Sequence, residues 1–301
     1  MPLSVLHWAG GKGRQLDYLL PLIPVTRLYV EPFGGGGSVL LNRPRSEIEV
    51  YNDLDGELVN LFAVLQDDDS YRRFRRTVAL VPYSRAGFEA SLHRVRNPVE
   101  TDMVRRAVDF YTVLNQSVSG KRLASVGDWS RNRTVNNADN WFRRQEGLVM
   151  VHERIRNVQL ESRDAIDIVH QWDTADTTFY LDPPYVLETR GRNRYYAVEP
   201  GDEYHRQLVE VLLSVKGAVV LSGYDHPIYG DLVGAGWYTD SYGQTTTMDI
   251  AESLRGGVKG RVEVVYRNRR AADYAMKRPL WLSDNARQNG AVVGGDGDAL
   301  E

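Results

Sequence analysis

The strongest constraint on the fold of this chain is the alternation of short β-prone runs with segments of helical periodicity. The β-prone runs occupy residues 26–31, 46–55, 158–162, 177–181, 217–224 and 261–267. Residues 202–215 form the clearest amphipathic pattern between them, with apolar positions spaced along one helix face. Strands that alternate with helices favour a parallel, doubly wound α/β sheet. We therefore predict this fold class, with any ligand bound at the carboxyl ends of the strands.

A mostly helical and increasingly basic region, residues 70–157, interrupts this alternation. Its pattern breaks at 119–140, a stretch rich in Ser, Asn, Gly and Arg that we predict to be an exposed loop. The boundaries predict a sheet-forming domain built from residues 1–65 and 150–283, with residues 66–149 as a helical insertion. The final residues, 284–301, are polar and Gly-rich, so we expect a flexible tail.

The composition excludes several classes of protein. The chain has no cysteine, which removes disulfides, thiolate nucleophiles and cysteine-based metal sites. Its 6 histidines are scattered, with no pair at metal-ligand spacing, and we expect no metal. No apolar run approaches the roughly 20 residues needed to cross a bilayer, and the first residues lack a signal-peptide core. We expect a cytoplasmic protein, with a monomer as the favoured state.

The distribution of charge indicates that any polyanion-binding surface is confined to part of the molecule. The net charge of −3 gives the whole chain no attraction to nucleic acid. Basic residues gather at 119–144, where the cations are Lys121, Arg122, Arg131, Arg133, Arg143 and Arg144. They gather again in "ETRGRNRYY", which holds Arg190, Arg192 and Arg194. Taken alone, such clusters are typical of a solvated surface.

The motif "EPFGGGG" follows the predicted strand 26–31. Its glycines let a ligand approach the backbone closely, because no Cβ stands in the way. It is not the dinucleotide fingerprint, since Val39 stands at the third glycine position, and "AGGKGR" is not a P-loop, since Gly13 follows Lys12. A purely structural turn is the alternative interpretation.

The motif "DPPY" ends the predicted strand 177–181. Because a residue before proline favours extended or turn geometry, a Pro-rich turn explains Pro183 and Pro184. It explains neither the acid Asp182 nor the ring of Tyr185. Both motifs lie at the carboxyl ends of strands, and they therefore predict one shared pocket.

The acids at the end of the strand 46–55 are further candidates. An acid at such a position accepts hydrogen bonds from a ribose in nucleotide-binding sheets, and it also suits a helix N-cap. Asp55 is better placed to cap the helix that begins in "GELVNLF". Asp53 is therefore the freer of the two and the candidate for ligand binding.

Five segments occur in a characteristic order: "HWAGGKG", "EPFGGGG", "VYNDLDGELVNLF", "FYLDPPY" and "EVVYRN". Over residues 5–65 and 150–270 the chain resembles the Dam-like (D12 class) DNA adenine-N6 methyltransferases. The resemblance implies a Rossmann-like S-adenosylmethionine-dependent methyltransferase sheet, with a helical target-recognition insertion at 66–149. It implies methyl transfer from S-adenosylmethionine to the exocyclic amine of a flipped adenine in double-stranded DNA, without a metal.

Methylation of the adenine amine explains why an acid and an aromatic ring flank the prolines of "DPPY". The adenine amine is a poor nucleophile, because its lone pair is delocalised into the ring. The carboxylate of Asp182 and the backbone carbonyl of Pro183 can accept its two hydrogens, and consecutive prolines hold these acceptors in place. Tyr185 offers a face for an extruded base to stack on. We predict Asp182, Pro183, Pro184 and Tyr185 as the catalytic set.

The resemblance also implies a cofactor-binding set, carried over by matching motifs. It comprises Trp8, Lys12, Phe33, Gly34, Gly36, Asp53, Asp164 and Asp182. Asp164 matches an acid that holds the adenine amine of the cofactor, although an acid soon after a strand is also common as a helix cap. His7 stands where we expect a lysine, and we assign it no role.

The resemblance fades through residues 66–150, where family members carry target recognition. A GATC-type specificity therefore does not follow from the resemblance. Contacts with phosphates position a protein on DNA without reading the base sequence, and basic residues make such contacts. The candidates for this contact are Lys121, Arg122, Arg131, Arg133, Arg190, Arg192 and Arg194. Tyr195 or Tyr196 could fill the gap left by a flipped base, but surface-loop tyrosines are usually amphipathic cover.

Three alternatives stay open at this point. Cytosine-N4 and RNA adenine methylation use the same exocyclic-amine chemistry, although Asp before the prolines favours adenine. A catalytically silent DNA-binding module could keep an inherited fold. Cytosine-C5 methylation is excluded, because it requires a cysteine nucleophile.

Overall fold

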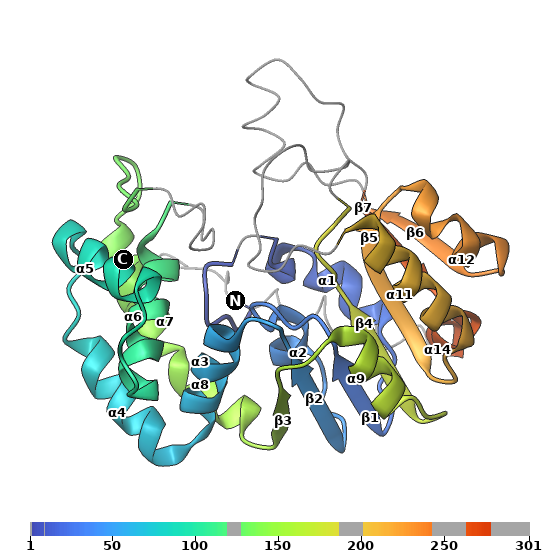
Figure 1. The fold of residues 1–301 in the computed structure, drawn as a ribbon, viewed down its shortest axis with the longest axis horizontal. Coiled ribbons are helices and arrows are strands. Elements are labelled where there is room, and N and C mark those ends of the chain that lie inside the picture. The colour runs from blue at the N-terminus through green and yellow to red at the C-terminus, as the bar shows by residue number, and fades with distance from the viewer. Residues whose placement is uncertain (1, 9, 119–127, 187–200, 243–262, 278–301) are drawn as a thin grey trace, which may run out of the picture.

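The computed structural model describes residues 2–8, 10–118, 128–186, 201–242 and 263–277. Its centre is a seven-stranded sheet in the order β3-β2-β1-β4-β5-β7-β6 (Figure 1). The strands are β1 Leu28–Glu31, β2 Ile48–Asn52, β3 Val158–Glu161, β4 Thr177–Leu181, β5 Ala218–Tyr224, β6 Tyr238–Tyr242 and β7 Glu263–Arg267. Strands β1 to β5 pair in parallel, which confirms the predicted α/β sheet.

The last part of the sheet departs from the prediction. Strand β7 lies between β5 and β6 and runs antiparallel to both. Strand β6 was not predicted, because its sequence "YTDSY" is polar and lies at the sheet edge. Reversal of β7 matters for the site, since it brings the first residue of this strand, Glu263, opposite Tyr224 at the end of β5. Its side chain therefore reaches the edge at which the parallel strands end.

Helices and short 3-10 turns surround the sheet. They are η1 Lys12–Arg14, α1 Leu16–Leu19, η2 Leu20–Leu22, α2 Ser38–Asn42, α3 Gly56–Gln66, α9 Ala165–Trp172, α11 Asp202–Ser214, η3 Pro227–Tyr229, α12 Gly230–Gly234 and α14 Arg269–Lys277. The predicted helix 202–215 is confirmed as α11.

Alternate residues of the strands bury into two separate hydrophobic clusters, one on each face of the sheet. Tyr29 and Tyr51 face a cluster that includes apolar residues of α1, α2 and α3. Val30 and Val50 face the other cluster, which α9, α11 and α12 cover. Each fully buried apolar side chain contributes about 1.5–3 kcal/mol, so burial on both faces is the main stabilising term. This is the doubly wound arrangement that the pattern of strands and helices predicts.

The predicted insertion is helical. Its helices are α4 Asp68–Ala79, α5 Arg85–Arg96, α6 Met103–Gln116, α7 Asn137–Glu146 and α8 Leu148–Ile155. Phe74, Tyr111 and Trp141 from these helices join the same cluster as Phe62 of α3. The helical region therefore shares its core with one face of the sheet, and α8 crosses the predicted boundary at residue 149.

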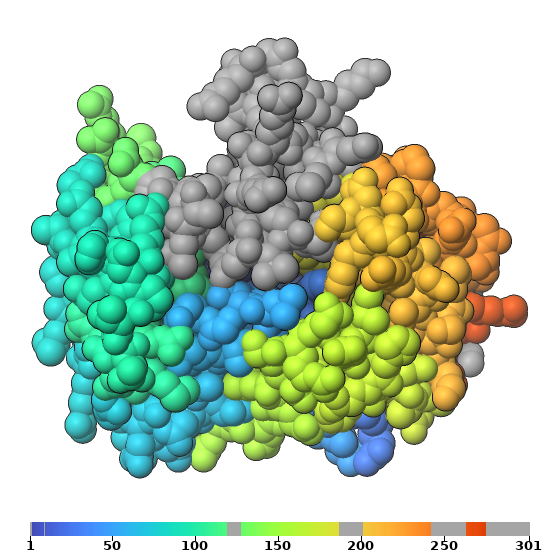
Figure 2. Space-filling model, in the orientation of Figure 1, coloured from blue at the N-terminus to red at the C-terminus, as the bar shows by residue number. Residues whose placement is uncertain are grey.

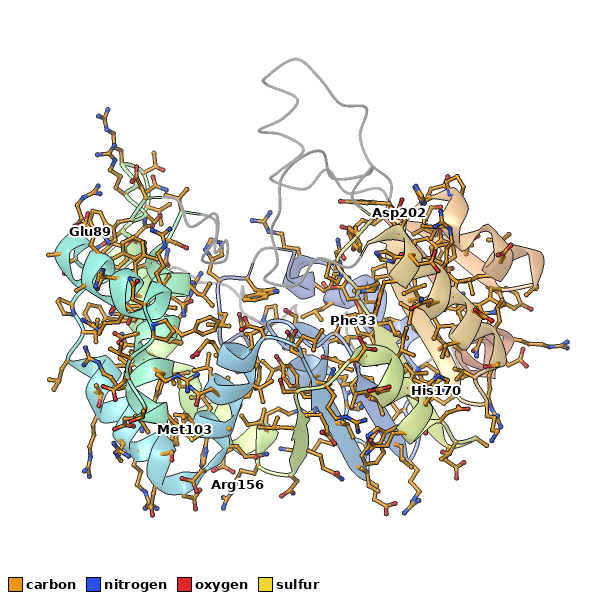
Figure 3. All side chains as sticks on the ribbon, in the orientation of Figure 1. Phe33, Glu89, Met103, Arg156, His170 and Asp202 are labelled. Carbon is orange, nitrogen blue, oxygen red and sulfur yellow. The ribbon has the colours of Figure 1, made fainter. Side chains whose placement is uncertain are left out.

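The carboxyl ends of the parallel strands lie between two groups of helices. Figure 1 shows α4 to α7 on one side of this edge and α11, α12 and β6 on the other. In the space-filling view the same two groups form the outer sides of the molecule (Figure 2). Phe33, just after β1, lies between the helix that carries Glu89 and the helix that begins at Asp202 (Figure 3).

Candidate active site

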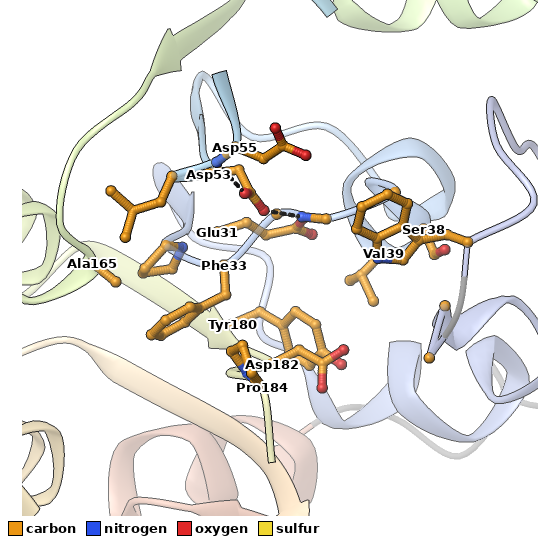
Figure 4. Close-up of a pocket in the computed structure, with 18 of the residues that line it drawn as sticks. Glu31, Phe33, Ser38, Val39, Asp53, Asp55, Ala165, Tyr180, Asp182 and Pro184 are labelled. Atoms are coloured by element: carbon orange, nitrogen blue, oxygen red, sulfur yellow. Dashed lines mark hydrogen bonds between the residues drawn. The ribbon is translucent and has the colours of Figure 1, made fainter. Parts of the chain in front are cut away.

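A cavity of about 370 Å³ opens at the carboxyl ends of β1, β2 and β4. Its lining includes every residue of the predicted cofactor set: Trp8, Lys12, Phe33, Gly34, Gly36, Asp53, Asp164 and Asp182. Figure 4 shows Phe33, Asp53 and Asp182 around it. Pro184 of the predicted catalytic set also lines it. Pro183 is buried and Tyr185 half-buried beside it. A cavity of this size is typical of a small-molecule or cofactor site.

The glycine loop after β1 is shaped by an aromatic neighbour. A Cβ added to Gly34 would lie 2.2 Å from a ring carbon of Tyr51, so no side chain fits there. The Tyr51 hydroxyl donates to the carbonyl of Gly35, whose φ of +49° suits glycine. At Gly34 the requirement for glycine is therefore already present in the protein's own packing. The predicted reason, close approach of a ligand, is not needed to explain it.

Asp53, predicted to be the freer of the two acids after β2, is held by hydrogen bonds to the backbone. Its two carboxylate oxygens accept the backbone N–H groups of Gly35 and Asp55, each at 2.8 Å (Figure 4). Asp55 caps α3 by accepting the N–H of Glu57, as predicted. The two bonds tie the end of β2 to the glycine loop and hold the Asp53 carboxylate at the cavity wall.

Asp164 is a helix cap that also lines the cavity. Its carboxylate caps α9 by accepting the N–H of Ile166 at 2.8 Å, and it also lines the cavity. The hydroxyl of Tyr204, from α11, donates to the same oxygen at 3.2 Å. The cap fixes this carboxylate at the mouth of the cavity, which leaves room for one further donor at its other oxygen.

Asp182 lies in a charged cluster directly after β4. The Lys12 ammonium is 3.0 Å from Asp182 Oδ1 and donates to the hydroxyl of Tyr185. The ring of Tyr185 packs edge-on against Tyr224, with centroids 4.4 Å apart. Lys12 is only 4% exposed, which is rare for a lysine without a paired acid. The acid and the ring of "DPPY" are thus held by one buried cation.

Opposing effects set the ionisation of this pair. Burial raises the pKa of Asp182, and the adjacent Lys12 ammonium opposes that rise. Burial alone would lower the pKa of Lys12, but Asp182 and Glu263 outweigh it and raise the pKa above its ordinary value. Lys12 therefore stays charged at neutral pH, and the Asp182 carboxylate is its counter-ion.

Glu31 is a further acid at the cavity that the sequence analysis did not assign. It ends β1, is 1% exposed, and accepts the Tyr29 hydroxyl at 2.5 Å. Burial raises the pKa of Glu31 to about 8. It therefore holds a proton at neutral pH and presents a neutral, polar lining. An acid at the end of a fully buried strand was the available signal.

Comparison with known proteins identifies the family of the chain. The model of the D12 class N6 adenine-specific DNA methyltransferases matches residues 8–233, which contain the glycine loop, Asp53 and "DPPY". This chain belongs to that family. It is an adenine-specific DNA methyltransferase, which confirms the predicted family and the predicted methylation of adenine in DNA.

Individual relatives agree with this assignment. The DNA adenine methylases of Salmonella typhi and of Escherichia coli strain K12 are each 24% identical over 267 residues, which cover 86% of this chain and 92% of theirs. The DNA N-6-adenine-methyltransferase of Escherichia phage P1 is 36% identical over 63 residues, which cover 21% of this chain and 8% of that protein. The long matches extend over most of the chain, and the short one covers a small part of it.

The structure of this methyltransferase places few of the predicted DNA-contact residues. Arg131 and Arg133 are exposed between α6 and α7. The others, together with Tyr195 and Tyr196, lie outside the described residues: Lys121, Arg122, Arg190, Arg192 and Arg194. Among the described residues, no group of His, Cys, Asp and Glu suits a metal ion. Every helix in the described ranges is too short or too polar to cross a bilayer.

Arg144 of α7 is a cation that the prediction left among the solvated basic residues. It is half-buried, and its guanidinium donates to Asn115 Oδ1 at 2.7 Å. The same oxygen accepts the backbone N–H of His7, so Arg144 lies where the N-terminal segment meets α6. Within the described part of the chain, no carboxylate pairs with it. Burial lowers the pKa of Arg144, although arginine stays charged at any physiological pH.

Proposed function

We propose that this methyltransferase uses S-adenosylmethionine and acts on an adenine flipped out of double-stranded DNA. The observation that carries the proposal is the position of Asp182. It follows β4 at the wall of a cavity that also contains the glycine loop and Asp53. An acceptor for the amine and a pocket for a methyl donor thus lie side by side.

The residues of the cavity fit this cofactor. Asp53 is held by two backbone N–H groups and suits the ribose hydroxyls, while Asp164 suits an amine donor. Trp8, Phe33 and the glycines supply apolar and backbone surface. S-adenosylmethionine, when bound, supplies an electrophilic methyl group on a sulfonium cation, and the carboxylates of this cavity favour a cation.

The roles of the "DPPY" residues follow from the amine's chemistry. Asp182 and the backbone carbonyl of Pro183 accept the two amine hydrogens, so the nitrogen lone pair becomes available for attack. Burial of Asp182 makes its carboxylate a stronger acceptor than it would be in water. The same carboxylate takes up the proton that the methylated nitrogen releases. Pro184 keeps this turn rigid.

Tyr185 provides the stacking surface for the extruded base, a contact worth about 1–3 kcal/mol. Its ring is restrained from two directions, by the edge of Tyr224 and by the Lys12 ammonium 4.8 Å from its centroid. A restrained ring loses little conformational entropy when a base stacks on it.

DNA contacts are proposed for the basic residues that the sequence analysis singled out. We propose that Lys121, Arg122, Arg131, Arg133, Arg190, Arg192 and Arg194 contact phosphates, and that Arg144 joins them. A half-buried guanidinium without a carboxylate partner among the described residues keeps donors for an anion. We further propose residues 1–65 and 150–283 as the catalytic domain, residues 66–149 as the target-recognition unit, and a monomer as the active species.

Asp182→Asn tests the central role. The variant keeps the shape of the side chain but removes the charged acceptor, and losing one such electrostatic contribution costs about a hundred- to a thousandfold in rate. Cofactor binding should persist: S-adenosylmethionine at 100-fold above its dissociation constant should still add about 2.7 kcal/mol of stability. Turnover is followed by transfer of tritiated methyl groups to DNA.

Asp231→Asn, an exposed acid in the first turn of α12, is the matched control and should keep full activity. Mass spectrometry of the digested product should detect N6-methyladenine. Turnover of Asp182→Asn within a few fold of the wild type would contradict the proposed role of Asp182. N4-methylcytosine, or methylation of RNA only, would contradict the proposed substrate.

A further inference from the structure

Lys12 links the catalytic acid to a second carboxylate. Its ammonium lies 3.0 Å from Asp182 Oδ1 and 3.8 Å from Glu263 Oε2. Glu263 is 9% exposed, so this second acid is also largely withdrawn from water. One ammonium shared by two carboxylates leaves the cluster with one excess negative charge. A charge excess in a largely buried cluster is costly unless further donors stabilise it.

Gln15 supplies such a donor. Its side-chain amide donates to Glu263 Oε2 at 2.7 Å, the same oxygen that faces Lys12. Gln15 directly follows the 3-10 turn η1, three residues after Lys12, and residues three apart lie on one face of such a turn. One short turn therefore presents an ammonium and an amide side by side to one carboxylate.

The reversed strand β7 makes this arrangement possible. The first residue of a parallel strand would lie at the opposite edge of the sheet, far from the cavity. Because β7 runs antiparallel to β5, Glu263 pairs with Tyr224, whose ring packs against Tyr185. The Lys12–Glu263 contact and the Tyr224–Tyr185 contact thus brace the "DPPY" turn from the same side of the sheet.

We propose that Glu263 and Gln15 are positioning residues, which hold the Lys12 ammonium against Asp182 and set the charge balance of the catalytic carboxylate. The proposal rests on the role proposed for Asp182. Neither residue needs to touch the substrate, because both act through Lys12. Without Glu263 the ammonium would have Asp182 as its single carboxylate, and its attraction would draw Asp182 away from the amine.

The effect on ionisation has a defined direction. The groups that face Asp182 are Lys12 from η1, Glu263 from β7, Tyr180 within β4 and Tyr185 in the turn. Lys12 lowers the pKa of Asp182 and Glu263 raises it. Removing the charge of Glu263 therefore lowers the pKa of Asp182. The acidic limb of the pH–rate profile, where Asp182 loses its proton, should move to lower pH.

Glu263→Gln is the first test, since it keeps the acceptor for Gln15 and removes the charge. A misplacement of about 1 Å at a reacting group costs about a hundredfold in rate, so we expect kcat to fall about ten- to a hundredfold. The KM for DNA should change little, and the acidic limb of kcat should move to lower pH. Glu161→Gln, at the end of β3, makes the same change away from Lys12 and should alter neither quantity.

Gln15→Met is the second test, because it keeps all charges and removes one hydrogen bond. It should lower kcat by a smaller factor than Glu263→Gln does. If both residues act through Lys12, Gln15→Met should cause no further loss of kcat in the Glu263→Gln background. Circular dichroism and thermal melting report whether Glu263→Gln folds. If it does not fold, Gln15→Met still tests the contact between Gln15, Glu263 and Lys12.

The outcomes separate the two proposals. Loss of activity in Asp182→Asn, with normal kcat and an unshifted pH profile in Glu263→Gln, would overturn the positioning role and leave the catalytic role intact. Full activity in Asp182→Asn would overturn both. Independent, multiplicative losses in the double variant Gln15→Met/Glu263→Gln would overturn the shared link.

Discussion

Gly34→Ala adds one methyl group where the ring of Tyr51 already lies. The new Cβ would be 2.2, 2.5 and 2.7 Å from three ring carbons of Tyr51. Carbon atoms in contact lie about 3.5–4.0 Å apart, so the ring or the loop would have to move by about 1 Å or more. The ring has little freedom to move: it is fully buried, packs on Phe62 with centroids 4.4 Å apart, and donates to Gly35 at 2.6 Å.

Overpacking of this kind costs about 1–3 kcal/mol, and loss of the hydrogen bond to Gly35 adds about 1 kcal/mol. We therefore expect the free energy of unfolding of Gly34→Ala to fall by about 2–4 kcal/mol. Urea denaturation followed by circular dichroism, without cofactor, measures it. Gly56→Ala is the control, because a Cβ there meets nothing within 4 Å and alanine favours the helix α3.

A ligand-approach role for Gly34 predicts a different pattern. In that case the ligand-free protein would keep its stability, and only the affinity for S-adenosylmethionine would fall. A stability of Gly34→Ala within about 0.5 kcal/mol of the wild type would therefore refute the packing argument. If the packing argument holds, Tyr51→Leu in the Gly34→Ala background should recover part of the lost free energy of unfolding, because leucine leaves space at the position of the ring.

Two further predictions concern a buried acid and the DNA surface. Because the pKa of Glu31 is about 8 in the folded state, above its unfolded value, the free energy of unfolding should fall as pH rises from about 5 to 8. Glu31→Gln removes this contribution, so its stability relative to the wild type should rise by up to about 1.4 kcal/mol per pH unit, measured by urea denaturation, and a constant difference would contradict the buried proton. Arg131→Ala and Arg133→Ala should each weaken DNA binding about equally on all sequences and reduce the salt slope by about 1, measured by fluorescence anisotropy. Arg72→Ala, an exposed arginine of α4, is the control, and an unchanged slope in both variants would remove Arg131 and Arg133 from the contact.

Local signals in the sequence were enough to find every strand of the sheet except β6, together with the glycine loop and "DPPY". A buried strand has a hydrophobic pattern that depends on its own residues, and the edge at which parallel strands end follows from their order. Asp55 as a helix cap is local in the same way, because the cap bonds a backbone group two residues along the chain. The cavity residues Trp8, Phe33 and Asp164 were named by motif matching, and the fold brings them together around one cavity.

Contacts between distant residues were not available from any local pattern. Strand β6 is polar and is defined by its pairing with β7, and the direction of β7 depends on its neighbours. Asp53 was predicted to be freer than Asp55, and its bond to the N–H of Gly35 was not predicted because that group belongs to the loop after another strand. Gly34 was explained by a ligand because the ring that excludes a side chain belongs to Tyr51 of the next strand.

The sequence by itself indicated the class of sheet, the edge at which the cavity lies and the residues that we propose carry the chemistry. Only the tertiary structure decided how those residues are held, since it alone joins Lys12 to Asp182 and Glu263 across the sheet. The physical reason is that periodicity and capping act within a few residues of the chain. The charge balance of a buried cluster instead depends on which distant side chains share the same small volume.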